Sequence, residues 1–557
     1  MTTFEPKTLS VRYAHDSARK SVKKRIFCAC IVAFACADAL AADAVVGTGT
    51  PASCTETMFN AALALVINDN IGGTLTFNCG PDPGIILFSA PKNLINFVVI
   101  DGGGKMTLDG QDQTRLFNIN QDGVDGRTEV TLRNINLNRG NTGAEAFGGA
   151  VLVNANTRLS LEQVSVSNSL ASVAGGAIAT FAGVVLDVRN SHFISNQSAN
   201  GGAIATRAIL NVADSSFTNN IASGGEGGAI QSYEQNLIIS GSSFTGNSAR
   251  FGGAIFKSGA QMDFRDANFA ANTSGDDGGA IYLRADVASV LSRDTVFWAN
   301  AAARDGGGVF SKSIFASERS SFAGNSARAG GAIRMEGGGL LLDKVTLNDN
   351  TAQIEGGAIS ALTVSTPLGL NGNPEIRQTT TSNNTVTAGF GGDFAFTSSN
   401  GVLATIKNTS LMGGSASSGG STLYLNGIIF VEIARSLLWA RAGSTCSFPG
   451  VESIFSSGSN IGASACGLNA PSDAISETFA GFGLGEFAHY GGRTNTFLPQ
   501  PGSAAIDRGG SDCAPVDARD RPAPLDGDGN GSVLCDAGAV ERQLLELPAA
   551  LFRNGFE

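Results

Sequence analysis

Apolar and polar residues alternate in short runs through the middle of the chain. In Leu186-Asp187-Val188, Leu210-Asn211-Val212 and Met262-Asp263-Phe264 every second residue is apolar, and the runs end near Gly, Asn or Ser. A period of two between turn-forming residues predicts short β-strands with one buried face. Between residues 100 and 430 no stretch of ten or more residues has the periodicity of an amphipathic helix. The pattern therefore predicts an all-β region.

The strands belong to a repeat of about 26 residues. The tetrapeptide GGAI or a close variant begins at Gly148, Gly175, Gly201, Gly227, Gly252, Gly278, Gly306, Gly330 and Gly356. The element F-x-x-N keeps the same period, starting at Phe193, Phe217, Phe244, Phe269, Phe297 and Phe322 and continuing as Leu347 with Asn350. A unit of this size cannot bury its own apolar face, so we expect it to stack as one coil of a parallel β-helix.

Each position that recurs from one repeat to the next has an expected role in that coil. We expect about three short strands and three bends per coil, wound to the right. The paired glycines allow a positive φ and leave room for the backbone of the next coil. Phe and Ile should stack inside the coil at about 4.8 Å, the spacing of paired strands. Asn suits a left-handed bend and permits an amide ladder along the axis.

Composition and charge narrow the class of protein. Glycine accounts for 73 of 557 residues and only 15% are charged, which excludes a helical bundle or a coiled coil. The formal charge is −11, and it becomes more negative when the basic segment 1–41 is removed. A chain with this charge has no basic surface for nucleic acid. We expect no nucleic-acid partner.

The amino terminus and the cysteines predict export. Residues 20–41 combine a basic cluster, a short apolar run and the small-x-small sequence Ala39-Leu40-Ala41, as in a cleaved signal peptide. The apolar run is shorter than the roughly 20 residues of a membrane-spanning helix. Six cysteines remain after cleavage, an even number that favours disulfides in an exported chain. Sequential pairing is the simplest of several connectivities for Cys54, Cys79, Cys446, Cys466, Cys513 and Cys535.

The GGAI and F-x-x-N repeats resemble those of polymorphic outer membrane proteins and, more broadly, the right-handed parallel β-helix proteins of the pectin-lyase-like superfamily. The resemblance implies a β-helix over 146–433, with a cap and first coils over 42–145. It implies little about activity, because these proteins include lyases, hydrolases and adhesins.

Residues 434–541 are similar to the choice-of-anchor Q domain found at the ends of exported bacterial β-helix proteins. The similarity rests on SGSNIGASAC (457–466), HYGGRTNTFLPQPGSAAIDRGG (489–510) and RPAPLDGDGNGSVLCDAGAVE (521–541). Where that family has Asp-Gln-Arg-Gly, this chain has Asp517-Ala518-Arg519-Asp520, so the match is partial there. The resemblance implies attachment at a surface. The tail, 542–557, is similar to short sorting tags ending in Gly-Phe-Glu.

One loop has the pattern of a calcium site. Asp526, Asp528 and Asn530 alternate with glycines, and Gly531 occupies the sixth position of the motif. The twelfth position is Ala537 instead of Glu, with Asp536 or Glu541 as substitutes. The alternative is an Asx-turn loop without metal.

A second group of charged residues precedes the glycine pairs: Glu226, Arg250, Asp276, Asp277, Arg304, Asp305, Arg328 and Glu355. One coil apart, they should form a column. Asp276 and Asp277 could bind calcium and polarise a uronate, with Arg250 or Arg304 as base, as in similar polysaccharide lyases. The alternating signs favour ion pairs between coils instead.

The other residues offer little for catalysis. Beyond the signal segment the only histidines are His192 and His489, too few for a His-rich metal site, and we expect His192 on a strand surface. We therefore predict an exported, monomeric, non-catalytic β-helix protein of the cell surface or medium, which adheres to a glycan or protein. The alternative is a calcium-dependent lyase or hydrolase of acidic glycans.

Overall fold

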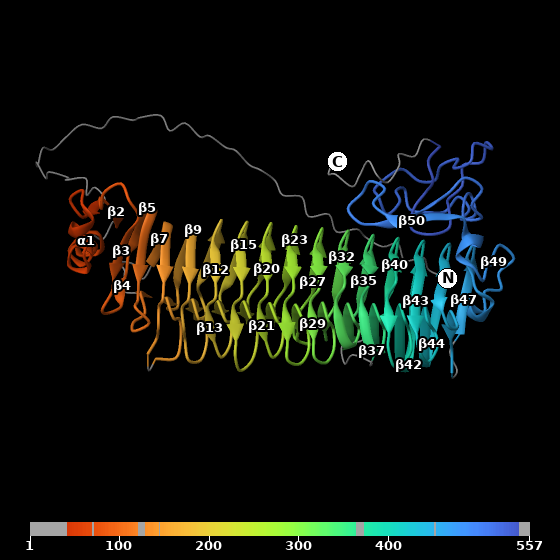
Figure 1. Cartoon of the computed structure of the whole chain (residues 1–557), viewed down its shortest axis with the longest axis horizontal. Coiled ribbons are helices and arrows are strands. Elements are labelled where there is room, and N and C mark those ends of the chain that lie inside the picture. The colour runs from red at the N-terminus through yellow and green to blue at the C-terminus, as the bar shows by residue number, and fades with distance from the viewer. Residues whose placement is uncertain are drawn as a thin grey trace, which may run out of the picture. The chain divides into compact units, whose positions relative to one another are not determined.

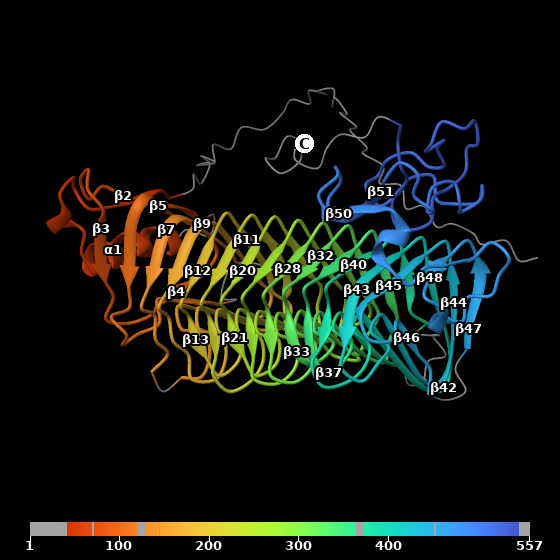
Figure 2. The ribbon, with the colours of Figure 1, turned by 45° about the vertical axis from the view of Figure 1, so that its right-hand side comes forward.

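The computed structural model describes residues 42–68, 72–120, 128–143, 145–363, 373–449 and 453–544. The expected signal peptide lies outside these residues, as does most of the expected sorting tag. The described chain is a parallel β-solenoid of about 15 turns with about 27 residues per turn, as the repeat predicts. Figures 1 and 2 show the coils following one another in sequence order.

The amino-terminal end of the solenoid carries the one α-helix among the described residues. Helix α1 (Glu56–Asn68) follows the 3-10 turn η1 (Pro51–Ser53) and packs against β1 and β2. Phe59 of α1 is buried against Phe88, with their ring centroids 4.9 Å apart. No helix in the described part is long and apolar enough to cross a membrane.

Successive coils pair in parallel along four sides. The first side contains β4 (Lys92–Leu94) and β6 (Phe117–Ile119), and it ends with β46 (Cys446–Ser447). Between them lie the strands that follow the glycine pairs: β8 (Val151–Val153), β10 (Ile178–Thr180), β14 (Ile204–Thr206), β18 (Ile230–Ser232), β22 (Ile255–Lys257), β26 (Ile281–Leu283), β30 (Val309–Ser311), β34 (Ile333–Glu336), β38 (Ile359–Thr363), β42 (Phe394–Lys407) and β44 (Leu423–Ala434).

The second side contains β1 (Ala44–Val46), β2 (Gly73–Phe77), β5 (Phe97–Asp109), β7 (Thr128–Asn138), β9 (Thr157–Ser167), β11 (Val185–Arg189), β15 (Ile209–Ala213), β19 (Leu237–Ser240), β23 (Met262–Arg265), β27 (Val290–Arg293), β31 (Phe315–Glu318), β35 (Leu340–Asp343), β39 (Glu375–Arg377) and β47 (Ser453–Gly458). The long strands β42 and β44 extend from the first side into this one.

The third side carries the F-x-x-N phenylalanines. It contains β3 (Gly84–Leu87), the later parts of β5, β7 and β9, and then β12 (His192–Ile194), β16 (Ser216–Thr218), β20 (Ser243–Thr245), β24 (Asn268–Ala270), β28 (Val296–Trp298), β32 (Ser321–Ala323), β36 (Thr346–Asn348), β40 (Thr380–Ser382), β43 (Ser410–Ala416), β45 (Leu437–Ala442), β48 (Ile461–Gly462) and β49 (Ala474–Ile475).

A fourth, very short side distinguishes the coil from the expected three strands. It contains β13 (Gln197–Ser198), β17 (Ile221–Ala222), β21 (Ser248–Ala249), β25 (Thr273–Ser274), β29 (Ala301–Ala302), β33 (Ser326–Ala329), β37 (Thr351–Glu355) and β41 (Thr385–Val386). Most of these strands are two residues long, and a segment that short shows no alternation of its own.

The glycine pairs have both expected roles, divided between the two residues. The first glycine adopts a positive φ, as at Gly252 with +62°. The second has no room for a side chain, because a Cβ on Gly253 would lie 2.1 Å from the carbonyl oxygen of Gly279 in the next coil. The pair therefore turns the chain and lets adjacent backbones approach.

The phenylalanines form the expected internal stack. Phe193, Phe217, Phe244, Phe269, Phe297 and Phe322 are fully buried and face their equivalents in register. Their ring centroids are 4.4–5.0 Å apart, and adjacent planes differ by less than 10°. The spacing of the rings follows the spacing of the strands that carry them.

The asparagines form the expected ladder, but they do not make the bend. Each Nδ2 donates to the Oδ1 of the asparagine in the next coil at 2.9–3.0 Å, in the order Asn196, Asn220, Asn247, Asn272, Asn300, Asn325, Asn350 and Asn384. The positive φ belongs to the preceding residue, for example Ser195 and Ala271. The expectation of a left-handed asparagine was therefore wrong by one position, because the ladder residue must point inward.

The carboxy-terminal part returns onto the third side of the solenoid. Its antiparallel strands β50 (Leu484–Ala488) and β51 (Thr496–Pro499) follow the 3-10 turns η3 (Ser464–Cys466) and η4 (Phe479–Phe482). Thr346 donates to the carbonyl of Asn495 at 2.7 Å, and the Thr380 and Thr496 hydroxyls are 3.0 Å apart. Ala539 N donates to Ser410 Oγ at 3.1 Å. Figures 1 and 2 show β50 above the coils of β40 and β43.

Candidate functional site

The charged residues before the glycine pairs come together as a network of ion pairs. Asp276 is 8% exposed, and its carboxylate contacts two arginines from neighbouring coils. Arg250 lies 3.2 Å from its Oδ2 and Arg304 lies 3.0 Å from its Oδ1. The Asp276 carboxylate is thus held by the two residues predicted as candidate bases.

Asp277 and Asp305 form the more buried half of the network. Burial, with the nearby charges of Asp305 and Asp276, raises the pKa of Asp277 to about 6 against the opposing effect of Arg304. The Asp305 N–H donates to Asp277 Oδ1 at 3.3 Å. Arg328 donates twice to the Asp305 carboxylate, at 3.1 and 2.9 Å.

The ends of the column are also occupied by hydrogen-bond partners. Glu226 accepts from Gln231 at 2.8 Å and from the Tyr233 hydroxyl. Glu355 accepts from Arg334 and, at 2.9 Å, from Ser360. The structure brings the whole predicted column together, and the contacts of its acidic residues run mainly between coils or to adjacent strand residues.

This arrangement is poorly suited to proton abstraction. Hydrogen bonding to Asp276 and the charge of Asp277 raise the pKa of Arg304 above its ordinary value, which is already high for a base. A base must lose its proton near the working pH, and this arginine retains it more strongly. Beside the column, Phe256, Tyr282 and Phe310 stack with centroids 5.3 and 4.9 Å apart. Phe256 and Phe310 are buried, so they offer little ring surface to a sugar.

The predicted calcium loop has a third carboxylate beside it. Oxygen atoms of Asp526, Asp528 and Asp507 all lie within 4.8 Å of one another. Asp526 accepts backbone N–H groups from Gly529 and Gly531 at 2.6 and 2.9 Å, which lowers its pKa. Asn530 donates to Asp528. Sequence reasoning missed Asp507, because it lies about twenty residues before the motif.

Asp536, the fourth predicted ligand, has other contacts. Its Oδ1 accepts from the Asp507 N–H at 2.8 Å, and its Oδ2 accepts from the Arg542 N–H at 2.6 Å. Burial raises the pKa of Asp536 to about 7 and that of Glu541 to about 9. Asp536 therefore holds the backbone of Asp507 in place through this hydrogen bond.

The six cysteines form three disulfides between sequence neighbours. Cys54 bonds to Cys79, Cys446 to Cys466, and Cys513 to Cys535. The first bond closes the amino-terminal cap and the second closes a late coil at β46 and η3. The third lies in the carboxy-terminal part, close to Asp507, where Gly509 N and Cys535 O are hydrogen-bonded.

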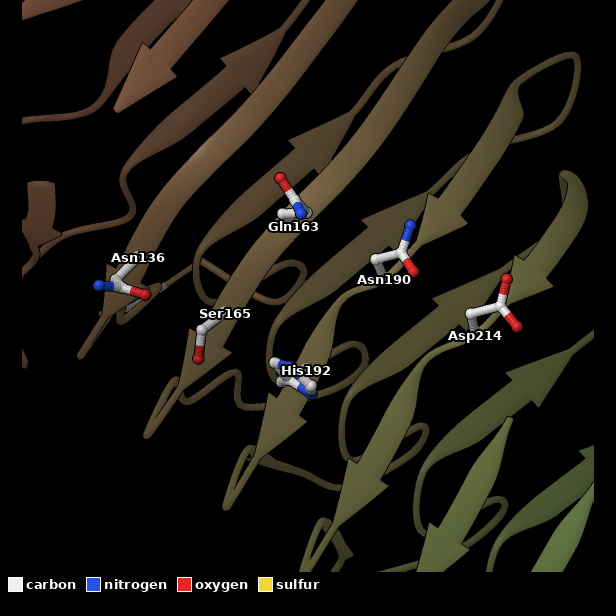
Figure 3. A pocket seen from close by; sticks show the side chains of 6 residues that line it. All are labelled: Asn136, Gln163, Ser165, Asn190, His192 and Asp214. Carbon is white, nitrogen blue, oxygen red and sulfur yellow. The ribbon is translucent and has the colours of Figure 1, made fainter. Parts of the chain in front are cut away.

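A shallow polar hollow lies on the third side, in coils that precede those contacted by the carboxy-terminal part (Figure 3). His192, which is exposed on β12 as expected, is one of its lining residues and contacts Ser216 Oγ at 2.8 Å. The hollow is lined by side chains that are all polar and able to hydrogen-bond: Asn136, Gln163, Ser165, Asn190, His192 and Asp214. Gln163, Asn190 and Asp214 occupy left-handed bends of consecutive coils. The recurrence of polar residues at these bends is the sequence feature that could have indicated the hollow.

Comparison with known families supports the repeat. The profile of the Chlamydia polymorphic membrane protein repeat matches residues 214–233, from the bend before β16 to β18. The matched segment contains one F-x-x-N element and one GGAI element. No curated protein matches the chain, and no solved structure matches it. The repeat unit of this chain is thus similar to that of the polymorphic membrane proteins, which suggests a bacterial surface protein.

Proposed function

We propose that this protein is an exported bacterial protein of the outer surface or the medium, and that it binds a polar ligand such as a glycan without catalysis. The observation that supports this function best is the polar hollow on the third side. Amide, imidazole, hydroxyl and carboxylate groups from four consecutive coils face solvent there. Such groups match the hydroxyls of a sugar chain lying along the coils.

The position of the hollow adds a second argument. Further along the same side, the carboxy-terminal part contacts Asp294, Thr346, Thr380 and Ser410. The residues that line the hollow come from earlier coils. We propose that the carboxy-terminal part serves attachment, as the choice-of-anchor Q resemblance implies, while the earlier coils remain accessible to a partner.

A binding experiment with matched variants tests this function. The chain from residue 42 is purified and applied to immobilised neutral and acidic glycans. Asn136→Ala removes a residue of the hollow, whereas Asn268→Ala removes an equally placed, exposed residue of the same column outside it. We expect Asn136→Ala and His192→Ala to weaken binding about tenfold and Asn268→Ala to leave it unchanged. Equal binding by all three variants would contradict the proposal.

The enzymatic alternative needs its own experiment. Pectic and other acidic glycans are incubated with the same protein, with and without calcium, and product length is measured. We expect no depolymerisation, because Asp276 is paired with Arg250 and Arg304. Depolymerisation that is lost in the Asp276→Ala, Asp277→Ala double variant would overturn our choice in favour of a lyase or hydrolase. Proteolysis of intact cells, with fractionation of the medium, tests the proposed location.

A further inference from the structure

The side chain of Asp507 is partly buried, and both of its carboxylate oxygen atoms are shielded from solvent. Neither oxygen accepts a hydrogen bond of regular geometry, although the N–H groups of Gly527 and Leu534 are close enough to favour the charged form. A buried charged group is normally paired or bound to a metal, because burial without compensation is costly. The carboxylate is also held in place, since the Asp507 N–H donates to Asp536.

The DGDGNG loop (526–531) lies beside the Asp507 carboxylate. Asp526 and Asp528 bring their oxygens within 4.8 Å of Asp507. The N–H groups that Asp526 accepts come from its own loop and leave further lone pairs on its oxygens. Three carboxylates this close repel one another unless a cation or a proton lies between them.

Two neighbouring arginines among the described residues, Arg508 and Arg542, have other contacts. Arg508 donates to the carbonyl oxygens of Ala504 and Ser472, at 2.8 and 2.9 Å. Arg542 donates to the carbonyl of Pro499 at 2.9 Å. Both guanidinium groups are thereby directed to backbone carbonyls.

We propose that Asp507, Asp526 and Asp528 together bind one Ca²⁺ ion. Oxygen is the only donor type in the group, which suits a hard cation. Ca²⁺ accepts six to eight oxygens in irregular geometry, whereas Mg²⁺ requires a near-ideal octahedron. A loop with three glycines and an exposed Asp528 can adjust to the larger ion. The ion would join the loop to the segment beside the Cys513–Cys535 disulfide.

The test uses Ca²⁺ itself as the probe on the chain from residue 42. Isothermal titration calorimetry after chelation is expected to give one Ca²⁺ per chain, with a Kd at or below about 1 mM, the range of extracellular modules. Asp507→Asn and Asp528→Asn should each weaken binding at least tenfold. Asp512→Asn, the same change at an exposed position of the same region, should not alter it.

Thermal unfolding separates loss of the site from loss of the fold. In EDTA, Asp507→Asn should unfold at or above the temperature of the wild type, because it removes repulsion. Added Ca²⁺ should raise the unfolding temperature of the wild type and of Asp512→Asn only. Absence of Ca²⁺ binding by the wild type, or full binding by Asp507→Asn, would overturn the proposal, and equal stabilisation by Mg²⁺ would overturn the choice of ion. None of these outcomes depends on the glycan-binding experiment.

Discussion

The side-chain amide of Asn384 donates to the carboxylate of Asp393 at 2.8 Å and ends the asparagine ladder on an acid. Asp393 is fully buried, and its second oxygen has no hydrogen-bond partner. Burial raises the pKa of this carboxyl to about 8. The last position of the ladder is therefore occupied by a group that is mostly protonated at neutral pH.

This pKa predicts a pH-dependent stability. The pKa of Asp393 is about 8 in the folded chain and near 3.8, its ordinary value, in the unfolded chain. The folded state thus holds the proton more tightly, and its stability falls as the pH rises from about 4 to about 8. Asp393→Asn should remove this component. The unfolding temperature of the wild type relative to Asp393→Asn should decrease between pH 5 and pH 8, and a constant difference would contradict the assignment. Asp263→Asn, on an exposed strand position, is the control.

A mutation within the ladder should be costly. Asn272→Ala removes the acceptor of Asn247 Nδ2 and the donor to the Phe244 carbonyl, both buried. Each unsatisfied buried group costs about 1–3 kcal/mol. Urea unfolding should show a loss of at least about 2 kcal/mol relative to Asn268→Ala, which truncates an exposed asparagine of the same coil. Equal stability of the two variants would show that the ladder contributes little.

The second glycine of a pair should not tolerate a side chain. In Gly253→Ala the Cβ would lie 2.1 Å from a backbone oxygen of the next coil, so the coils must separate. In Gly324→Ala the φ of +63° is unfavourable, but no atom lies within 4 Å. Gly324→Ala should cost about 1–2 kcal/mol, and Gly253→Ala should prevent native stacking. Circular dichroism and limited proteolysis compare the two, and a native-like Gly253→Ala would contradict the close approach.

Two arginines of the charged column, Arg328 and Arg250, should contribute differently to the free energy of unfolding. Arg328→Ala leaves Asp305, which is 1% exposed, without its cation. Arg250→Ala leaves Asp276 paired with Arg304. The first change should cost about 1–3 kcal/mol and the second less than about 1 kcal/mol. Urea unfolding of both variants provides the measurement, and the reverse order would contradict this assignment of partners.

The repeat was predictable because each coil contains its own signals. The F-x-x-N element indicated both the stack of Phe217 on Phe244 and the ladder of Asn220 with Asn247. A signal for the end of the ladder was also present, since Gly391-Gly392-Asp393-Phe394 has Asp where GGAI has Ala. Contacts between residues that are far apart in the sequence were not predictable, because no repeat relates them. Asp507 beside Asp528, and Thr380 beside Thr496, depend on how the carboxy-terminal part returns to the solenoid.

The segment 517–520 combines a buried ion pair with a contact to the solenoid. Asp517 and Arg519 form an ion pair at 2.8 Å, with both side chains 1% exposed. Asp520 is exposed and contacts Lys344 of the solenoid. The sequence alone indicated neither of these partners.

Because the strands of each described coil pair only with those of the coil before it and the coil after it, the solenoid is modular in length. An in-frame duplication from Gly227 to Phe251 would insert a complete coil with its own glycine pair, phenylalanine and ladder asparagine. It would lengthen the solenoid by one strand spacing, about 4.8 Å, and leave its cross-section unchanged. Recombination between repeats can therefore change the length of the solenoid while its core stays the same.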